Sequence, residues 1–313
     1  MSLEIQILLA VLIDLIIGDP RWLPHPVRLI GRGIAALERP LRRVMSSQRA
    51  NGVLLAMIVI GATGGVTFAA LRFAAQIDPL AADIVSAVFL YTALSIRDLG
   101  KHSLDVYRAL KSGNLEDARV KVSRMVGRDT NALDEKGVIR AAVESVAENT
   151  VDGIIAPLFF AALFGPVGAM MYKAASTLDS MVGYKNEKYR HFGWASARFD
   201  DAANFLPARL SAPLMAIGAL LTGNRPLAAL RICLRDRKLH ASPNSGIPEA
   251  AMAGALGVQL GGPLFRKGIL TELPTLGDAM EPLERRHILK ANAVMLAASL
   301  TAAVIFTGVR WLI

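Results

Sequence analysis

Cysteine and the motifs of the common enzyme classes are almost absent from this sequence. Its 313 residues include one cysteine, Cys233, which excludes an internal disulfide and a metal site built on paired cysteines. No Walker A, HExxH, GxSxG or protein-kinase signature occurs. Residues 31–36 match the spacing of a dinucleotide-binding fingerprint, but they follow no predicted strand, so we reject that match. The chemistry is therefore expected to depend on carboxylates, lysines and amides rather than on a covalent serine or cysteine.

A cleavable signal peptide and long low-complexity tracts are also lacking, whereas hydrophobic residues are abundant. They make up 53% of the chain, and the mean hydropathy is +0.41. Apolar runs alternate with charged loops, and the net charge is +9. In a membrane protein such an excess of lysine and arginine marks cytoplasmic loops beside anionic lipid rather than nucleic-acid binding. The sequence predicts an all-α, polytopic integral membrane protein with no nucleic-acid partner.

The apolar runs predict one membrane domain, residues 1–313. The expected spans are about 3–17, 53–70, 80–96 and 291–313. Two further apolar segments, 154–171 and 206–221, are interrupted by proline, which membranes tolerate where a segment lines a cavity. If both segments span, the loop between them lies outside; if both re-enter, it faces the cytoplasm. The basic excess of that loop favours re-entry. The mixed charges of residues 97–150 predict a helical cytoplasmic segment, in which Asn114 is the expected N-cap of one helix and a second helix is expected to begin at Asn131.

Residues 173–209, between the interrupted segments, carry charges of both signs, aromatics and amides. Ionisable groups at membrane depth are costly and are commonly functional, so this stretch is predicted to be the centre of the site. The alternative is a solvated loop that lysine and tyrosine anchor at the interface. The candidate catalytic residues are Lys173, Asp179 and Lys185, with Lys188 at the rim. The candidate substrate-binding residues are Thr177, Ser180, Tyr184, Tyr189, Arg198 and Asn204.

An acidic stripe precedes the first interrupted segment. Glu144, Glu148 and Asp152 are four residues apart, which places them on one face of a predicted helix beside Asn149, a further candidate for substrate binding. Like charges near an apolar segment need a metal ion, basic partners or exposure to water, and all three stay open. We expect Mg²⁺ ligands among the nearby carboxylates, which are Glu144, Glu148, Asp152, Asp200 and Asp201.

Two more polar clusters flank the chain. Prolines in residues 18–31 predict an extended exit from the membrane, and the candidates there are Asp14, Asp19, Trp22, His25 and Arg28. Trp22 and Arg28 could equally be interface anchors. In residues 242–250, Ile247 is the expected N-cap, so free helix amides beside Ser242, Asn244, Ser245 and Glu249 could receive an anion. The alternative is an ordinary helix start. Residues 260–289 are expected to be loop and amphipathic helix.

Four stretches of the chain resemble the CobD/CbiB family of cobalamin biosynthesis, the membrane-bound adenosylcobinamide-phosphate synthases. They are DLIIGDPRWLPHPVRLIG, ESVAENTVDGIIAPLFFA, STLDSMVGYKNEKYRHFGWASARFDDAANFLPAR and SPNSGIPEAAMAGALG. The resemblance runs through nearly the whole chain and implies amide ligation of adenosylcobyric acid with (R)-1-aminopropan-2-ol or its O-phosphate. It further implies ATP as the driver and the corrinoid as substrate. Activation of the acid with ATP adds Mg²⁺ to the expected cofactors, and the charge of the loops favours a site on the cytoplasmic side of the inner membrane. Other cobalamin-assembly enzymes are expected as partners.

Such a reaction needs an activated acid, cations around phosphates and a base for the amine. His25, Glu148 and Asp179 are the candidate bases, and the sequence does not choose among them. The alternative function is a non-catalytic corrinoid-binding or transport protein, because broken helices around charges also occur in transporters. No inverted repeat is evident in the hydropathy, which counts against transport. A third alternative is a membrane signalling protein.

Overall fold

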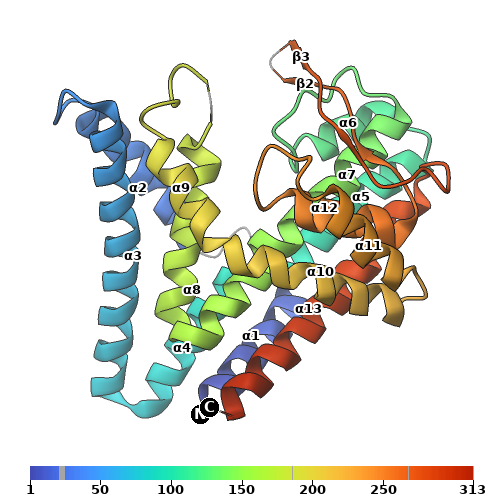
Figure 1. Ribbon diagram of the computed structural model, residues 1–313. Coiled ribbons are helices and arrows are strands. Elements are labelled where there is room, and N and C mark those ends of the chain that lie inside the picture. Colours follow the sequence, from blue (N-terminus) through green and yellow to red (C-terminus); the bar gives the residue numbers. More distant parts are fainter. Residues whose placement is uncertain (21–24, 185, 267, 313) are drawn as a thin grey trace. The chain divides into compact units, whose positions relative to one another are not determined.

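A computed structural model describes residues 1–20, 25–184, 186–266 and 268–312 of the chain (Figure 1). Helices dominate these residues, which confirms the all-α prediction. In chain order the helices are α1 (Leu3–Ile17), α2 (Pro26–Leu41), α3 (Gln48–Ile77), α4 (Pro79–Ala93), α5 (Ile96–Lys111), α6 (Leu115–Val122), α7 (Glu135–Thr150), a π-helical turn (Val151–Ile155), α8 (Ala156–Val182), α9 (Trp194–Ala203), α10 (Phe205–Leu221), α11 (Pro226–Asp236), α12 (Gly246–Leu256) and α13 (Arg286–Leu312). The strands are β1 (Leu260–Gly261), β2 (Leu264–Arg266), β3 (Ile269–Thr271) and β4 (Thr275–Leu276).

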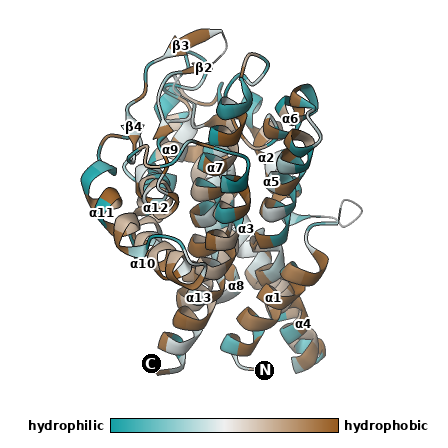
Figure 2. Ribbon diagram, turned by 90° about the vertical axis from the view of Figure 1, so that its right-hand side faces the viewer, coloured by the Kyte–Doolittle hydropathy of each residue, from teal (hydrophilic) through white to brown (hydrophobic). Residues whose placement is uncertain are grey.

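Four helical stretches of the described chain are long and apolar enough to cross a membrane. They are Gln48–Ile77, Pro79–Lys111, Glu135–Val182 and Arg286–Leu312, and the bent pair formed by α9 and α10 would make a fifth. The hydropathy colouring shows hydrophobic residues along α1, α4 and α13 (Figure 2). The predicted spans 53–70 and 291–313 fall on α3 and α13, whereas α1 has only 15 residues. These helices confirm a polytopic membrane protein.

Of the two segments predicted to be interrupted, one is broken within its helix and the other is not. Within α8, Gly165 has φ 64° and ψ −160° and precedes Pro166, so the helix is broken there. Only glycine adopts this backbone conformation without strain. Pro213 lies inside α10 without breaking it, because α10 runs as one helix from Phe205 to Leu221. Whether either segment spans or re-enters stays a prediction.

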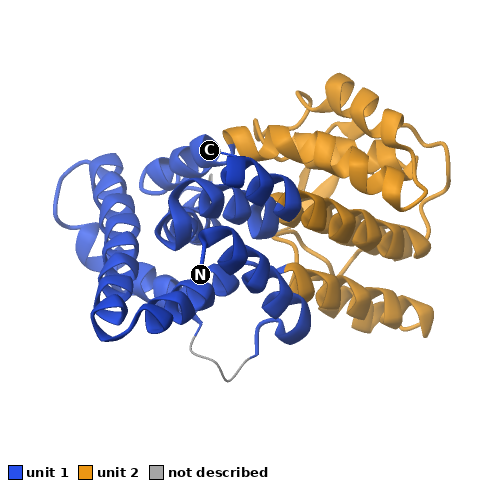
Figure 3. Cartoon of the chain, turned by 90° about the horizontal axis from the view of Figure 1, so that it is seen from below, with its two compact units in different colours: residues 1–95, 152–204, 303–313 blue, residues 96–151, 205–302 orange. Residues whose placement is uncertain are grey.

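The chain divides into two compact units, which interleave along the sequence (Figure 3). Unit 1 comprises residues 1–95, 152–204 and 303–313, and unit 2 comprises residues 96–151 and 205–302. In unit 1, α3 packs against α4, α8 and α9, and α2 packs against α3 and α8. Leu55, Leu178 and Phe192 are among the fully buried side chains of this core. A side chain at Gly52 would collide with the Phe192 carbonyl, so glycine is required for this approach.

In unit 2, α12 is buried along its whole length against α10, α11 and α7. Its alanines and glycines allow this, because a Cβ at Gly254 would lie 2.4 Å from the Ala228 carbonyl oxygen. Beside α12, β1 pairs with β4 and β2 with β3, both antiparallel. The expected amphipathic helix within residues 260–289 is wrong for the described residues before α13. Glycines at 261, 262, 268 and 277 have positive φ, and prolines interrupt the same region.

Local capping explains several helix ends. Asn114 caps α6 by accepting a hydrogen bond of 3.0 Å from the Asp117 amide, as predicted. Three predicted boundaries are wrong. The extended exit ends at Pro26, where α2 begins, because proline is favoured in a first helical turn. Helix α7 begins after its cap Asp134 rather than at residue 131, and α12 has Ser245 as its N-cap rather than Ile247.

Candidate functional site

A cavity of about 180 Å³ in unit 2 has a strongly polar lining. Helix α7 supplies three of its polar residues, α12 supplies one, and loops supply the others. These residues are Arg128, Glu144, Ser145, Glu148, His240 and Glu249. The cavity therefore brings together two stretches that the sequence singled out, the acidic stripe of α7 and the start of α12.

Among these residues, Glu144 has protein partners that compensate its charge. Its carboxylate is buried, pairs with the Arg128 guanidinium and accepts a 2.6 Å hydrogen bond from the Gly261 amide. A buried carboxylate with a cation and a backbone donor is compensated. Glu144 therefore ties α7 to the Arg128 loop and to β1, which is a structural role.

Glu148 and Glu249 are less well compensated. One ligand atom each from Glu148, His240 and Glu249 lies within 4.8 Å of the others. Burial and the neighbouring carboxylates of Glu148 and Glu144 raise the pKa of Glu249 well above its usual range, and Arg128 opposes them. Two adjacent carboxylates in a low dielectric can both ionise only when a cation neutralises them. Without a cation one of the two carboxyl groups keeps a proton, in line with the raised pKa of Glu249, and a metal ion or an ammonium group could take the place of that proton.

The hydrogen bonds of His240 decide what kind of cation suits the pair. The Ser242 amide donates to His240 Nδ1 at 3.0 Å, so in the neutral ring the proton is on Nε2. Nε2 lies 3.8 Å from a Glu249 oxygen and offers a proton rather than a lone pair to a metal. Without this nitrogen ligand, the donors are carboxylate oxygens, which fit Mg²⁺ or a substrate ammonium group better than Zn²⁺.

Unit 1 holds a second set of carboxylates around Asp200. The charges of Asp152, Asp179 and Asp201 all act on Asp200. Asn204 donates to Asp200 Oδ2 at 3.1 Å and accepts a 2.9 Å hydrogen bond from the Tyr172 hydroxyl. Arg198 pairs with Asp201 at 3.3 Å. An oxygen-only set of this kind fits Mg²⁺, so three of the predicted ligands, Asp152, Asp200 and Asp201, are together in this unit.

Lys173 lies half-buried on α8, where the charges of Asp14, Asp19 and Asp152 act on its ammonium group. Asp14 is fully buried. The His25 ring lies 3.1 Å from the Asp19 carboxylate, so this candidate base also belongs to unit 1. The structure thus places Lys173 in the same unit as Asp14, Asp19 and His25, an association that sequence reasoning did not predict.

The other predicted residues of unit 1 have more local partners. The Thr177 hydroxyl donates to the Lys173 carbonyl at 2.6 Å, and the Ser180 hydroxyl donates to the Ser176 carbonyl at 2.9 Å. Arg28 and Tyr184 are exposed. Trp22 and Lys185, predicted for binding and catalysis, lie outside the described residues.

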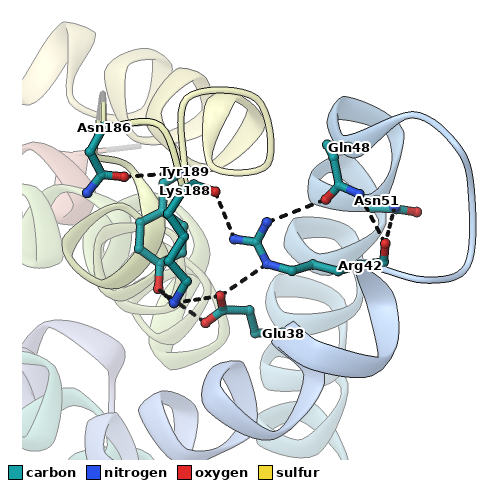
Figure 4. Close-up of polar contacts among 7 residues, drawn as sticks. All are labelled: Glu38, Arg42, Gln48, Asn51, Asn186, Lys188 and Tyr189. Carbon is teal, nitrogen blue, oxygen red and sulfur yellow. Dashed lines mark hydrogen bonds and ion pairs between the residues drawn. The ribbon is translucent and has the colours of Figure 1, made fainter.

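Tyr189 belongs to a polar contact between α2 and the loop before α9 (Figure 4). Glu38 on α2 pairs with Arg42 at 3.1 Å and with the Lys188 ammonium at 3.0 Å, and the Tyr189 hydroxyl donates to it at 3.2 Å. Arg42 also donates to the Lys188 carbonyl at 3.0 Å. The Asn186 side chain accepts a 3.0 Å hydrogen bond from the Tyr189 amide. This contact anchors the loop to α2.

In unit 2 most of the remaining predicted residues make hydrogen bonds to nearby backbone groups. Asn149 donates to the Ser145 carbonyl at 2.9 Å. The Ser242 hydroxyl accepts from the amides of Asn244 and Ser245, both at 3.3 Å. Arg128 and His240 were missed by sequence reasoning. For His240, the sequence offered one indication, its position two residues before the Ser242 stretch. For Arg128, the spacing of residues along the chain gives no indication of its contact with Glu144.

Comparison with known proteins gives a consistent result over the whole chain. A family model described as CobD/Cbib protein matches residues 7–295. The chain is 54% identical to cobalamin biosynthesis protein CobD of Geobacter metallireducens over 278 residues, which cover 89% of this chain and 87% of the relative. It is 48% identical to the CobD of Klebsiella pneumoniae, with 96% of each chain covered. It is 46% identical to cobalamin biosynthesis protein CbiB of Salmonella arizonae, with 97% of each covered. No solved structure matches the chain.

Proposed function

Because this chain belongs to the CobD/CbiB family and acts in cobalamin biosynthesis, we propose that it is an ATP-dependent amide ligase of the membrane. Its substrates would be adenosylcobyric acid and (R)-1-aminopropan-2-ol or its O-phosphate. The product would be adenosylcobinamide or its phosphate. The expected location is the inner membrane, with the site on the cytoplasmic side.

A carboxylate does not react with an amine in water unless it is first activated, so the proposed reaction needs two steps. A carboxylate oxygen of the corrinoid attacks the γ-phosphorus of ATP, which forms an acyl phosphate and releases ADP. The amine nitrogen then attacks the acyl carbon, phosphate leaves, and a base accepts the proton that the nitrogen loses. This sequence requires a carboxylate set for Mg²⁺, an acceptor for the amine proton and cationic groups for phosphate.

The single observation that carries the proposal is the pairing of half-buried Glu148 with buried Glu249 in a polar cavity of unit 2. An incoming substrate ammonium group would take the place of the proton that this pair otherwise holds. Once the amine is bound, Glu148 can accept its proton, which makes Glu148 the candidate base best supported among the three. In unit 1, Asp152, Asp200 and Asp201 are the residues proposed to hold Mg²⁺, which would neutralise phosphate charge.

Turnover by purified protein in detergent tests this proposal. The protein is incubated with adenosylcobyric acid, ATP, Mg²⁺ and each amine in turn, and the corrinoid product is identified by mass. A ligase forms the amide without any membrane gradient. Glu148→Gln should lower the rate by about 10²–10³-fold, the usual loss when one preorganised polar group is removed from a site. Glu272→Gln, at an exposed position of the same unit, should leave it unchanged. Corrinoid binding without amide formation would favour the non-catalytic alternative.

A further inference from the structure

One side of α2, in unit 1, is exposed and positively charged. Arg32 and Arg39 are seven residues apart, which places them on the same side of the helix, and both are exposed. Arg43 is exposed in the turn that follows, four residues after Arg39. The opposite side of α2 packs in the core of unit 1, where Ile34 is fully buried. Arg32, Arg39 and Arg43 therefore form an arginine row that faces away from the core.

The arginine row lacks the carboxylate partners that neighbouring cations have. Glu38 is the one acidic residue of α2, and it pairs with Arg42 at 3.1 Å and with Lys188 at 3.0 Å. Its side chain is only 15% exposed, so its charge is engaged on the inner side of the helix. Among the residues that the structure describes, no carboxylate lies within ion-pair distance of the arginine row. Like charges on one side of a helix repel one another, so this face is suited to an anionic partner.

The helix that follows shows where the arginine row lies relative to the membrane. Helix α3 has 30 residues, or about 45 Å at 1.5 Å per residue, which exceeds the hydrocarbon core of about 30 Å. Its ends therefore reach the headgroup regions. The side chains of Gln48 and Asn51, in the first turns of α3, donate to the Arg42 carbonyl at 3.0 and 3.2 Å (Figure 4). These hydrogen bonds hold the end of α2 at the start of α3, at headgroup level.

Side chains typical of a membrane interface accompany the arginine row. Leu29, one turn before Arg32, is 56% exposed, and Val44, directly after Arg43, is 57% exposed. In the first turn of α3, the Arg49 guanidinium lies over the Trp194 ring, with 5.7 Å between its carbon and the ring centroid. Trp194 is itself exposed. Tryptophan and arginine are both enriched where a protein passes from lipid to water, so this end of unit 1 has the character of an interface.

We propose that the arginine row binds the headgroups of anionic phospholipids, so that the end of α2 lies on the surface of the bilayer that α3 enters. The headgroup phosphates accept hydrogen bonds from the guanidinium groups, and Leu29 and Val44 contact the adjacent acyl chains. These exposed apolar side chains favour a lipid surface over nucleic acid, which offers the same phosphate charge but no apolar phase. The inference is independent of the proposed ligation, because the arginine row belongs to neither set of carboxylates.

Native mass spectrometry of the full-length protein in detergent measures this binding directly. The protein is titrated with phosphatidylglycerol, which is anionic, and with phosphatidylcholine of the same acyl length, which is zwitterionic. The wild type should bind phosphatidylglycerol more tightly. Arg32→Gln and Arg39→Gln should each weaken phosphatidylglycerol binding by about fivefold, and the triple variant that also contains Arg43→Gln should weaken it by about 100-fold. Binding of phosphatidylcholine should stay the same in all of them.

Two controls separate the loss of charge from damage to the fold. Replacement of the same three arginines by lysine keeps the positive charges and should retain most of the phosphatidylglycerol affinity. Arg108→Gln removes an exposed arginine of unit 2 that pairs with Asp105 at 2.9 Å, and this variant should bind phosphatidylglycerol as the wild type does. The single variants and the lysine variant keep the test valid if the triple glutamine variant fails to fold.

Three results would overturn the proposal. The first is equal phosphatidylglycerol affinity in the wild type and the glutamine variants. The second is an equal loss in the lysine and glutamine variants, because charge would then not be the cause. The third is binding of a labelled single-stranded oligonucleotide that the glutamine variants lose while phosphatidylglycerol binding is unchanged, which would assign the arginine row to nucleic acid. If no amide forms in the turnover assay but phosphatidylglycerol binding depends on the arginine row, the ligase function fails while the lipid site stands.

Discussion

At the residue scale, Glu144 and Glu148 occupy successive turns of α7 but have different surroundings. Glu144 has a guanidinium and a backbone amide as partners, whereas Glu148 faces Glu249 and the proton-bearing side of His240. The first arrangement is complete without a ligand, and the second is not. Helical spacing alone treats the two carboxylates as equivalent.

This difference predicts opposite outcomes for two conservative substitutions. Glu144→Gln should destabilise unit 2 by about 3–5 kcal/mol, because it leaves Arg128 without its buried partner. Glu249→Gln should preserve stability and raise the KM for the amine, because it removes one of the two carboxyl groups proposed to bind the ammonium group. Thermal unfolding and steady-state kinetics on both variants check the assignment. The reverse pattern would place the ligand-binding carboxylate at Glu144.

In unit 1 the residue-scale prediction concerns the metal. Asp200→Asn should raise the Mg²⁺ concentration needed for half-maximal turnover, since Asp200 lies among the charges of Asp152, Asp179 and Asp201. Glu187→Gln, at an exposed position of the same unit, is the matched control. A magnesium titration that is identical in wild type and Asp200→Asn would refute the ligand assignment.

At the scale of elements, the contact between α2 and the loop before α9 should be sensitive to acid. Burial raises the pKa of Glu38, but hydrogen bonds from Lys188 and Arg42 lower it by more, so its pKa lies below the ordinary value of 4.5. A carboxyl group with a lowered folded-state pKa stabilises the fold above its unfolded pKa. That contribution is lost as the pH falls through the folded pKa.

The corresponding experiment compares wild type with Glu38→Gln. At pH 7 the wild type should be more stable by about 1 kcal/mol, a modest value because Lys188 is largely exposed. The difference should shrink as the pH is lowered below 4.5. Thermal unfolding at a series of pH values measures it, with Glu187→Gln as the control. A difference that does not change with pH would mean that the Glu38 charge contributes nothing to the contact.

Sequence reasoning worked best for elements whose signals are local. The Asn114 cap, the apolar runs of α3 and α13, and the glycine–proline break in α8 all depend on neighbouring residues. The failures involve wider context. Residues 260–289 contain too many glycines and prolines for a helix. Contacts between segments that are far apart in the chain determine the surroundings of His240 and Arg128. The spacing of residues along the sequence does not predict such contacts.

At the scale of the whole molecule, the sequence predicted one membrane domain, and the structure contains two interleaved compact units. Composition changes where unit 1 ends at Ser95, because the apolar α4 is followed by the charged α5 of unit 2, but no compositional signal assigns residues 152–204 and 303–313 to the same unit as residues 1–95. Each unit contains its own set of carboxylates. The cavity lined by Glu148 and Glu249 belongs to unit 2, and the carboxylates around Asp200 and Lys173 belong to unit 1.

The side of the membrane that the loop before α9 faces is a prediction about the whole molecule. We expect this loop to face the cytoplasm, so a cysteine at Lys188, in a Cys233→Ser background, should react with an impermeant maleimide only from that side. Lys188 is exposed and its substitution leaves the cores intact. A cysteine in place of the exposed Ser112, in the predicted cytoplasmic segment, is the control. Labelling of residue 188 from the outer face alone would show that both interrupted segments span.

The central claim is that ATP activates the corrinoid carboxylate for amide formation. Transfer of oxygen from that carboxylate to phosphate tests the claim most directly. Adenosylcobyric acid labelled with ¹⁸O in the reacting carboxylate is converted with ATP and the phosphorylated amine, and the released inorganic phosphate is examined by mass. The account predicts that one labelled oxygen moves to inorganic phosphate for each amide formed. Label that appears in AMP, or amide that forms without any transfer of label, would contradict it.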